Sequence, residues 1–144
     1  VLGSFFLTHP PICPFKVDVA AHPLTEGVGA FETTDEPYFI ELQDPEHTEV
    51  LLTSDFGAGG HWPPVQTLYG KDTSLRADGR TRVLGYTKRV GAGRVTYYAL
   101  GHCHNPAIHA TRGAAPDETV GANFHGAWDS PAFERLLRNA IRYR

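Results

Sequence analysis

The stretch Arg94–His104 constrains the fold more than any other part of the chain. Apolar, aromatic and β-branched residues dominate positions 95–100, which is typical of a buried β-strand. The run stops at Gly101, a residue type that permits a sharp turn or the close approach of a ligand. His102 and His104 follow, and in an extended chain both rings would lie on one side. Open α/β sheets place ligand sites at such strand ends, although two histidines there can equally serve only to hydrogen-bond the next loop.

Further strands and one helix are predicted by hydrophobic periodicity and turn signals. Strands are expected over residues 15–19, 38–42, 50–54, 83–90 and 94–100, the last two forming a hairpin. A C-terminal helix is expected over residues 131–143, with an apolar face toward the sheet formed by Phe133, Leu136, Leu137, Ala140 and Ile141. These elements predict a mixed α/β domain.

Composition is that of an ordinary soluble globular protein. The chain has 144 residues, about one domain, of which 41% are hydrophobic and 20% charged. A formal charge of −3 disfavours a nucleic-acid partner, which requires a basic surface. No stretch approaches the roughly 18 apolar residues of a membrane helix. Cys13 and Cys103 are too few for a disulfide framework, so we expect reduced thiols and a cytoplasmic location.

Four side chains are candidates for acid–base catalysis, namely His22, Asp35, Glu36 and His102. A histidine and a carboxylate together provide the groups that remove a proton beside a carbonyl. The same set is compatible with a divalent metal, although its spacing is not diagnostic of one. Each residue also has a structural interpretation, because His22 can satisfy backbone groups in its turn and the two adjacent carboxylates can cap the segment that follows them.

Four other residues are candidates for contacts with a substrate, namely His61, Trp62, Arg94 and His104. His61 and Trp62 lie in a long segment rich in glycine and proline, where an aromatic side chain is harder to explain by packing. Trp62 is therefore the better candidate to stack on a sugar ring. Trp128 is expected in the core.

A pocket is expected beside His102. The strand before His102 would open at one edge of the sheet, where crevices form in such folds. Histidine and carboxylate together can share a proton or a metal, so a carboxylate near His102 would give this pocket a chemical role.

Several short motifs, in this order and spacing, resemble the ThuA-like (trehalose utilisation) family. They comprise His22 to Gly27, Thr34 to Tyr38, Val83 to Arg94, Leu100 to His102, and Trp128 with Pro131, Phe133, Leu136, Asn139, Ala140 and Ile141. The resemblance runs from about Phe15 to the C-terminus. It implies a flavodoxin-like α/β fold with a mixed sheet, related to class I glutamine amidotransferases. It also implies an enzyme of sugar catabolism that acts on keto-sugars or related disaccharides, with a small-molecule sugar as its partner. The family pattern further puts the turn at His22 and the segment with Asp35 and Glu36 within reach of the edge beside His102. We therefore expect His102, His22 and at least one of Asp35 and Glu36 to line one pocket, with the loop around Trp62 at its rim.

The chain departs from this family in two ways. ThuA-like domains carry a longer N-terminal half, so residues 1–144 are expected to form the C-terminal part of a longer domain and to lack the first βα units. An upstream segment or a second copy of the chain would then complete the sheet. The loop over residues 105–127 is also longer than the usual link. The missing half favours an alternative function, a non-catalytic carbohydrate-binding or assembly module with the same fold.

Overall fold

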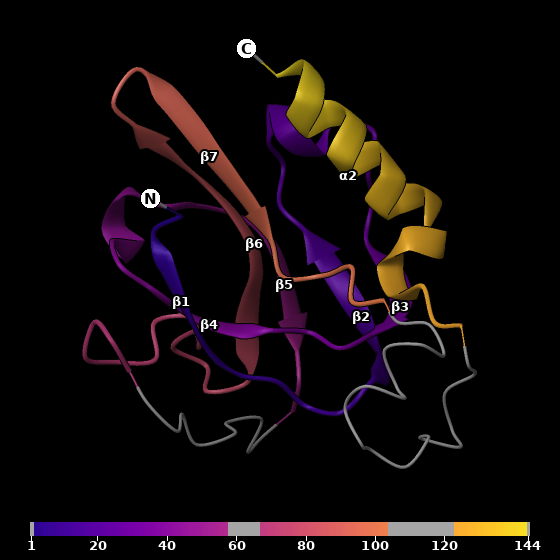
Figure 1. Ribbon diagram of the computed structural model, residues 1–144, viewed down its shortest axis with the longest axis horizontal. Coiled ribbons are helices and arrows are strands. Elements are labelled where there is room, and N and C mark those ends of the chain that lie inside the picture. The colour runs from indigo at the N-terminus through magenta and orange to yellow at the C-terminus, as the bar shows by residue number, and fades with distance from the viewer. Residues whose placement is uncertain (1, 58–66, 104–122, 144) are drawn as a thin grey trace.

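Seven strands and one α-helix form the regular structure of residues 2–57, 67–103 and 123–143, the part of the chain that the structure, a computed structural model, describes. Five strands pair in the order β3-β2-β5-β6-β7, and β1 pairs with β4 in a second sheet (Figure 1). The elements are β1 (Ser4–Thr8), β2 (Cys13–Val19), η1 (Pro23–Thr25), β3 (Phe31–Asp35), β4 (Phe39–Leu42), η2 (Pro45–His47), β5 (Glu49–Asp55), β6 (Thr81–Val90), β7 (Gly93–Tyr98), η3 (Gly126–Asp129) and α2 (Pro131–Arg142).

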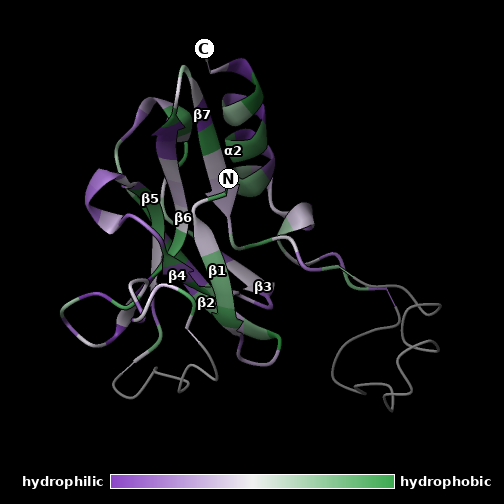
Figure 2. Ribbon diagram, turned by 60° about the vertical axis from the view of Figure 1, so that its left-hand side comes forward, coloured by the Kyte–Doolittle hydropathy of each residue, from purple (hydrophilic) through white to green (hydrophobic). Residues whose placement is uncertain are grey.

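The larger sheet is covered on both faces. Helix α2 packs on one face, where its side chains join a core formed by Val17, Leu24, Leu51, Leu52, Leu84, Ala99, Ala127, Phe133 and Leu136. Strand β4 packs on the other face, where its Ile40 and Leu42 join Val83 and Tyr86 of β6 in a second cluster. Figure 2 shows hydrophobic residues along β1 and the larger sheet, and hydrophilic residues on the outer side of α2. Burial of each leucine in these layers stabilises the fold by roughly 1.5–3 kcal/mol.

The mixed α/β architecture predicted from the sequence is confirmed. All five predicted strands and the final helix are present, with ends that differ by a few residues. Two strands, β1 and β3, were not predicted. Every strand pair in the described residues is antiparallel. The C-terminal ends of neighbouring strands therefore lie at opposite ends of the sheet.

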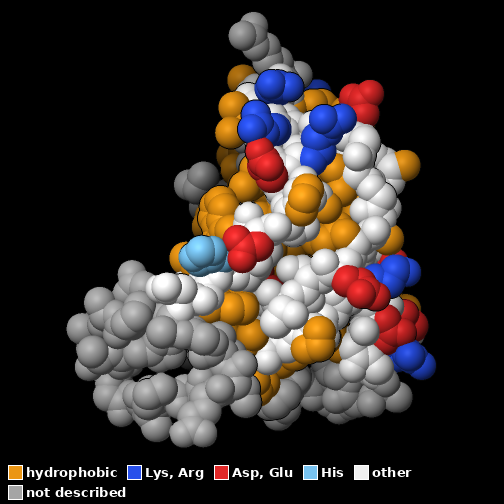
Figure 3. Space-filling view, turned by 90° about the vertical axis from the view of Figure 1, so that its right-hand side faces the viewer, with side chains coloured by type: hydrophobic (Ala, Val, Ile, Leu, Met, Phe, Trp, Pro, Cys, Tyr) orange, Lys and Arg blue, Asp and Glu red, His pale blue; other side chains and the backbone are white. Residues whose placement is uncertain are grey.

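Helix α2 buries a narrower face than its sequence predicts. Phe133 and Leu136 are buried, but Ile141 is 84% exposed. The placement of Ile141 on the sheet-facing side was therefore wrong, because it lies about 80° around the helix from Phe133, on the side away from Leu136. Figure 3 shows Lys and Arg side chains gathered near the top of the surface on the side of the molecule that carries α2. On this helix, Arg138 pairs with Glu134 at 2.6 Å.

Two segments that follow opposite edges of the larger sheet come together. β3 and β7 are its outer strands, yet the backbone N–H of Tyr38, just after β3, donates to the carbonyl of Ala99, just after β7, at 3.2 Å. This contact sets residues 35–38 beside residues 99–102. The candidate site lies at this junction.

Candidate functional site

Asp35 joins the segments that surround the site. Its side chain is fully buried. The carboxylate accepts hydrogen bonds from the backbone N–H groups of Glu36 at 2.7 Å, Gly101 at 2.8 Å, His102 at 3.1 Å and Ala127 at 2.9 Å. Charge-assisted bonds of this kind are strong. Asp35 therefore holds the backbone of the site in place, and it is not among the residues that line the cavity beside His102.

Two glycines permit this close approach. Gly101 has φ +96°, and a Cβ there would lie 3.1 Å from Nε1 of Trp128. Gly126 has φ +56°, and a Cβ there would lie 2.5 Å from the carbonyl oxygen of His102. Both the backbone conformation and the space beside it therefore require glycine at these positions.

Glu36 lies between two imidazole rings. Nδ1 of His102 is 2.8 Å from Oε2 of Glu36, and Nδ1 of His9 is 3.0 Å from Oε1. The side chains of Glu36 and His102 are only 14% and 18% exposed, whereas His9 is 41% exposed. The ring of Tyr38 contacts both imidazoles, with centroid distances of 5.7 Å to His9 and 6.4 Å to His102. The carboxylate of Glu36 thus contacts two histidines, of which His102 is shielded and His9 is open to solvent.

A cavity of about 190 Å³ lies beside this cluster, lined by Glu36, Tyr38, Tyr97, Tyr98, Ala99, Leu100, Gly101 and His102. Burial raises the pKa of Tyr97 and of Tyr98 to about 12, so both hydroxyls stay protonated at neutral pH. The Tyr98 hydroxyl is buried and has no hydrogen-bond partner among the described residues. The cavity therefore places an imidazole–carboxylate pair beside aromatic residues.

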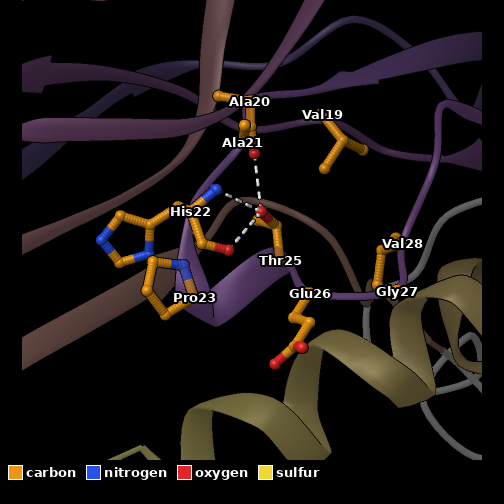
Figure 4. Close-up of a pocket in the computed structure, with 9 residues that line it drawn as sticks. All are labelled: Val19, Ala20, Ala21, His22, Pro23, Thr25, Glu26, Gly27 and Val28. Atoms are coloured by element: carbon orange, nitrogen blue, oxygen red, sulfur yellow. Dashed lines mark hydrogen bonds between the residues drawn. The ribbon is translucent and has the colours of Figure 1, made fainter.

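His22 lies elsewhere. It lines a larger cavity of about 590 Å³ formed by residues 19–28 (Figure 4). Its Nδ1 accepts a hydrogen bond from the backbone N–H of Leu24 at 3.0 Å, and its Nε2 is 3.3 Å from Oε2 of Glu49. Both ring nitrogens are thus engaged by the protein. The structural interpretation of His22, as a residue that satisfies its own turn, describes this arrangement.

The structure does not bring His22 and His102 to one pocket. Glu49, the partner of His22, also pairs with Arg94 at 2.7 Å. Arg94 lies near the start of β7, whereas His102 follows its end. At about 3.3 Å of rise per residue, the length of β7 puts His22, at the Arg94 end, on the order of 20 Å from His102. The expectation of a shared pocket assumed that strand ends meet as in a parallel sheet. In this antiparallel sheet, the end of β2 lies beside the starts of β5 and β7 instead.

The other candidates have different outcomes. His61, Trp62 and His104 lie outside the described residues, so their predicted roles stay predictions. Trp128 was expected in the core, but it is 54% exposed, and its indole N–H donates to the carbonyl of Gly101 at 2.8 Å. Across the described ranges, no group of three His, Cys, Asp or Glu side chains is arranged to hold a metal ion.

His9 is the member of the site that the sequence did not reveal. It follows β1 and precedes Pro10, as His22 precedes Pro23. The His-Pro dipeptide is thus the signal that was available. Its partner, however, depends on how β1 and β3 are placed, and neither strand was predicted.

Comparison with known protein families identifies the family of this chain. The ThuA family model, described as trehalose utilisation, matches residues 1–112. The chain belongs to the ThuA family. No curated protein and no solved structure matches the chain. None of the helices in the described residues is long and apolar enough to cross a membrane.

The ThuA match covers the catalytic candidates but not the C-terminal helix. His9, Asp35, Glu36 and His102 all lie within residues 1–112, whereas η3 and α2 lie beyond them. The motif around Trp128 and α2, which contributed to the resemblance seen in the sequence, is therefore outside the matched range. Family membership suggests a role in trehalose utilisation.

Proposed function

We propose that the chain is part of an enzyme of sugar catabolism that acts on keto-sugars or related disaccharides, with His102 and Glu36 as its acid–base pair. The proposal includes a flavodoxin-like domain for the complete protein, as the ThuA family implies. A related disaccharide with a carbonyl on one ring is the expected substrate. Membership of the ThuA family supports the substrate class.

The observation that carries this proposal is the contact of His102 with Glu36 at the wall of a cavity. At 2.8 Å from a carboxylate oxygen, Nδ1 of His102 must carry the hydrogen, because two acceptors at that distance would repel each other. In the neutral ring the lone pair is then on Nε2. A carboxylate that orients an imidazole in this way also stabilises the imidazolium that forms when the ring takes a proton.

The cavity suits one sugar ring. Its volume of about 190 Å³ is below the range of roughly 300–1,000 Å³ that is common for ligand pockets, so it would hold one end of a disaccharide. Tyr38 and Tyr97 provide aromatic surface for the apolar face of the ring.

The decisive experiment replaces His102 and measures turnover of a panel of 3-keto-disaccharides. His102→Ala should lower kcat/KM by roughly 10²–10⁴-fold, the usual contribution of an acid–base group. His47→Ala is the matched control, because His47 also lies beside a carboxylate, Asp44 at 2.9 Å, but on the exposed η2. Circular dichroism and thermal unfolding would establish that both variants fold. Unchanged turnover in His102→Ala would contradict the assignment.

The aromatic lining of the cavity also favours a second candidate, a carbohydrate-binding module without catalysis. Tyrosine side chains at the cavity can hold a sugar whether or not a proton is transferred. Isothermal titration with the same sugars, run beside the turnover assay, separates the two functions. Binding without turnover in the wild type would support the module, and loss of turnover with retained binding in His102→Ala would support the enzyme.

A further inference from the structure

The second imidazole on Glu36 has no role in the proposed function as stated so far. His9 lies at the outer side of the cluster, and its ring contacts Tyr38, which lines the cavity. It is more than twice as exposed as His102, at 41% against 18%. His9 is not itself among the residues that line the cavity, but it contacts two of them, Glu36 and Tyr38, and is the more exposed of the two imidazoles.

The protonation of His9 at Nδ1 follows from its neighbours. Nδ1 is 3.0 Å from the carbonyl oxygen of Pro10 and 3.0 Å from Oε1 of Glu36. Both of these oxygens only accept hydrogen bonds, so Nδ1 carries the hydrogen and the lone pair of the neutral ring is on Nε2. No hydrogen-bond partner of Nε2 is found among the described residues. His9 is thus oriented by the same carboxylate, through the same ring atom, as His102.

The charges around Glu36 suit one extra proton shared between the two rings. Glu36 presents Oε1 to His9 and Oε2 to His102, so its negative charge faces an imidazolium whichever ring is protonated. Asp35 is the adjacent carboxylate, but its oxygens face backbone N–H groups. Tyr38 contacts both rings and carries no charge at neutral pH. One carboxylate therefore balances one imidazolium at either position.

From this arrangement we infer that His9 is a second acid–base group of the same site, and that it works as a pair with His102 on a keto-sugar. This inference rests on the proposed function. His102 takes the proton from the carbon beside the carbonyl, and the electron pair of that C–H bond forms the C=C bond of an enol. The carbonyl π electrons move to the oxygen, which takes a proton from His9. His9 starts as the imidazolium and ends neutral, whereas His102 starts neutral and ends as the imidazolium. The positive charge thus moves from His9 to His102 through the substrate, Glu36 keeps its charge beside both rings, and no oxidant or reductant is needed.

The test follows exchange of the proton beside the carbonyl of a 3-keto-disaccharide in D₂O by proton NMR. His9→Phe keeps the ring packing on Tyr38 and Phe6 but removes both nitrogens, and it should slow the exchange about 10²-fold. His9→Ala should slow it similarly and recover when imidazole is added, which a structural role would not produce. His47→Ala should exchange at the wild-type rate.

The outcomes separate this inference from the proposed function. Exchange at the wild-type rate in His9→Phe, with exchange lost in His102→Ala, would overturn the role of His9 and keep the proposed function. An absence of exchange in the wild type would overturn the proposed function, and nitrogen NMR of the histidine rings would then decide the pairing. Glu36→Gln should shift the ring signals of both His9 and His102. A shift of the His102 signals alone would overturn the pairing.

Discussion

The pairs His102–Glu36 and His22–Glu49 have the same composition but different surroundings. Glu36 is mostly shielded, faces imidazoles on both of its oxygens and lines a cavity. Glu49 is 51% exposed and is held by Arg94 as well as by His22. His22 is further engaged by the N–H of Leu24. In the first pair the imidazole faces a place for a ligand, whereas in the second pair both partners are used to hold β5, β7 and η1 together.

The difference shows that a histidine and a carboxylate become a catalytic candidate only through what else contacts them. Arg94, and to a smaller degree His22, lowers the pKa of the Glu49 carboxyl. That carboxylate is therefore a poor proton acceptor at neutral pH. Glu36 has no Lys or Arg within ion-pair distance in the described part of the chain, so its charge remains available to the imidazoles.

Replacement of Asp35 should have the largest effect on stability. It should disturb the His102–Glu36 pair and leave the His22–Glu49 pair intact. Asp35→Ala removes the acceptor of four backbone N–H groups, and a buried donor left without a partner costs about 1–3 kcal/mol. We therefore expect a loss on the order of 3–5 kcal/mol in the free energy of unfolding, measured by urea unfolding. Asp18→Ala is the control, because Asp18 is exposed and, among the described residues, forms an ion pair only with Lys16. Equal losses in the two variants would contradict the role of Asp35.

The two glutamates should differ next in their effect on turnover. Glu36→Gln keeps the size of the side chain but removes the charge that stabilises an imidazolium, so kcat on the 3-keto-disaccharide panel should fall by about 10²-fold. Glu49→Gln should leave kcat within roughly two-fold, because Glu49 lies beside Arg94 at the other end of β7. Comparable losses in both variants would show that the two pairs are not distinct in function.

The smallest expected effect is the contribution of Glu49 to the pH dependence of the free energy of unfolding. Since Arg94 lowers the pKa of this carboxyl in the fold, its stabilisation is complete above the ordinary glutamate pKa of about 4.3 and is lost as the pH falls through the lowered value. Because the pair is exposed, the free energy of unfolding of the wild type at pH 7 should exceed that of Glu49→Gln by only about 0.2–1 kcal/mol. Unfolding experiments at pH 7 and at strongly acidic pH should show this difference disappear. A difference that stayed constant would contradict the assignment.

The fold was predictable where burial imposes a pattern. β5, β6 and β7 are rich in apolar residues, and α2 has a proline at its first position and a helical spacing of apolar residues. β3 was missed because its sequence, Phe-Glu-Thr-Thr-Asp, is mostly polar, as an edge strand permits. β1 was missed because a proline-rich stretch follows it.

The site was predictable in its residue types but not in its partners. The resemblance to the ThuA-like family led us to expect at least one of Asp35 and Glu36 beside His102, and Glu36 contacts it. The separation of His22 could not be read from the sequence, since it depends on the antiparallel order of the strands. Asp35 was expected to do chemistry, and only its contacts with three segments show that it supports the backbone.

The contacts of Asp35 also bear on when the site forms during folding. Its carboxylate bonds to Gly101, 66 residues away, and to Ala127, 92 residues away. Contacts between such distant residues form slowly, because a long loop must close before the bond stabilises it. β2 and β3, like β6 and β7, are close in sequence and can pair early. The hydrogen bonds around Asp35 are complete only after η3 has docked, because Ala127 supplies one of them. Recovery of activity on refolding should therefore lag behind recovery of the sheet, and a protein that turns over its substrate is one whose C-terminal region has already folded into place.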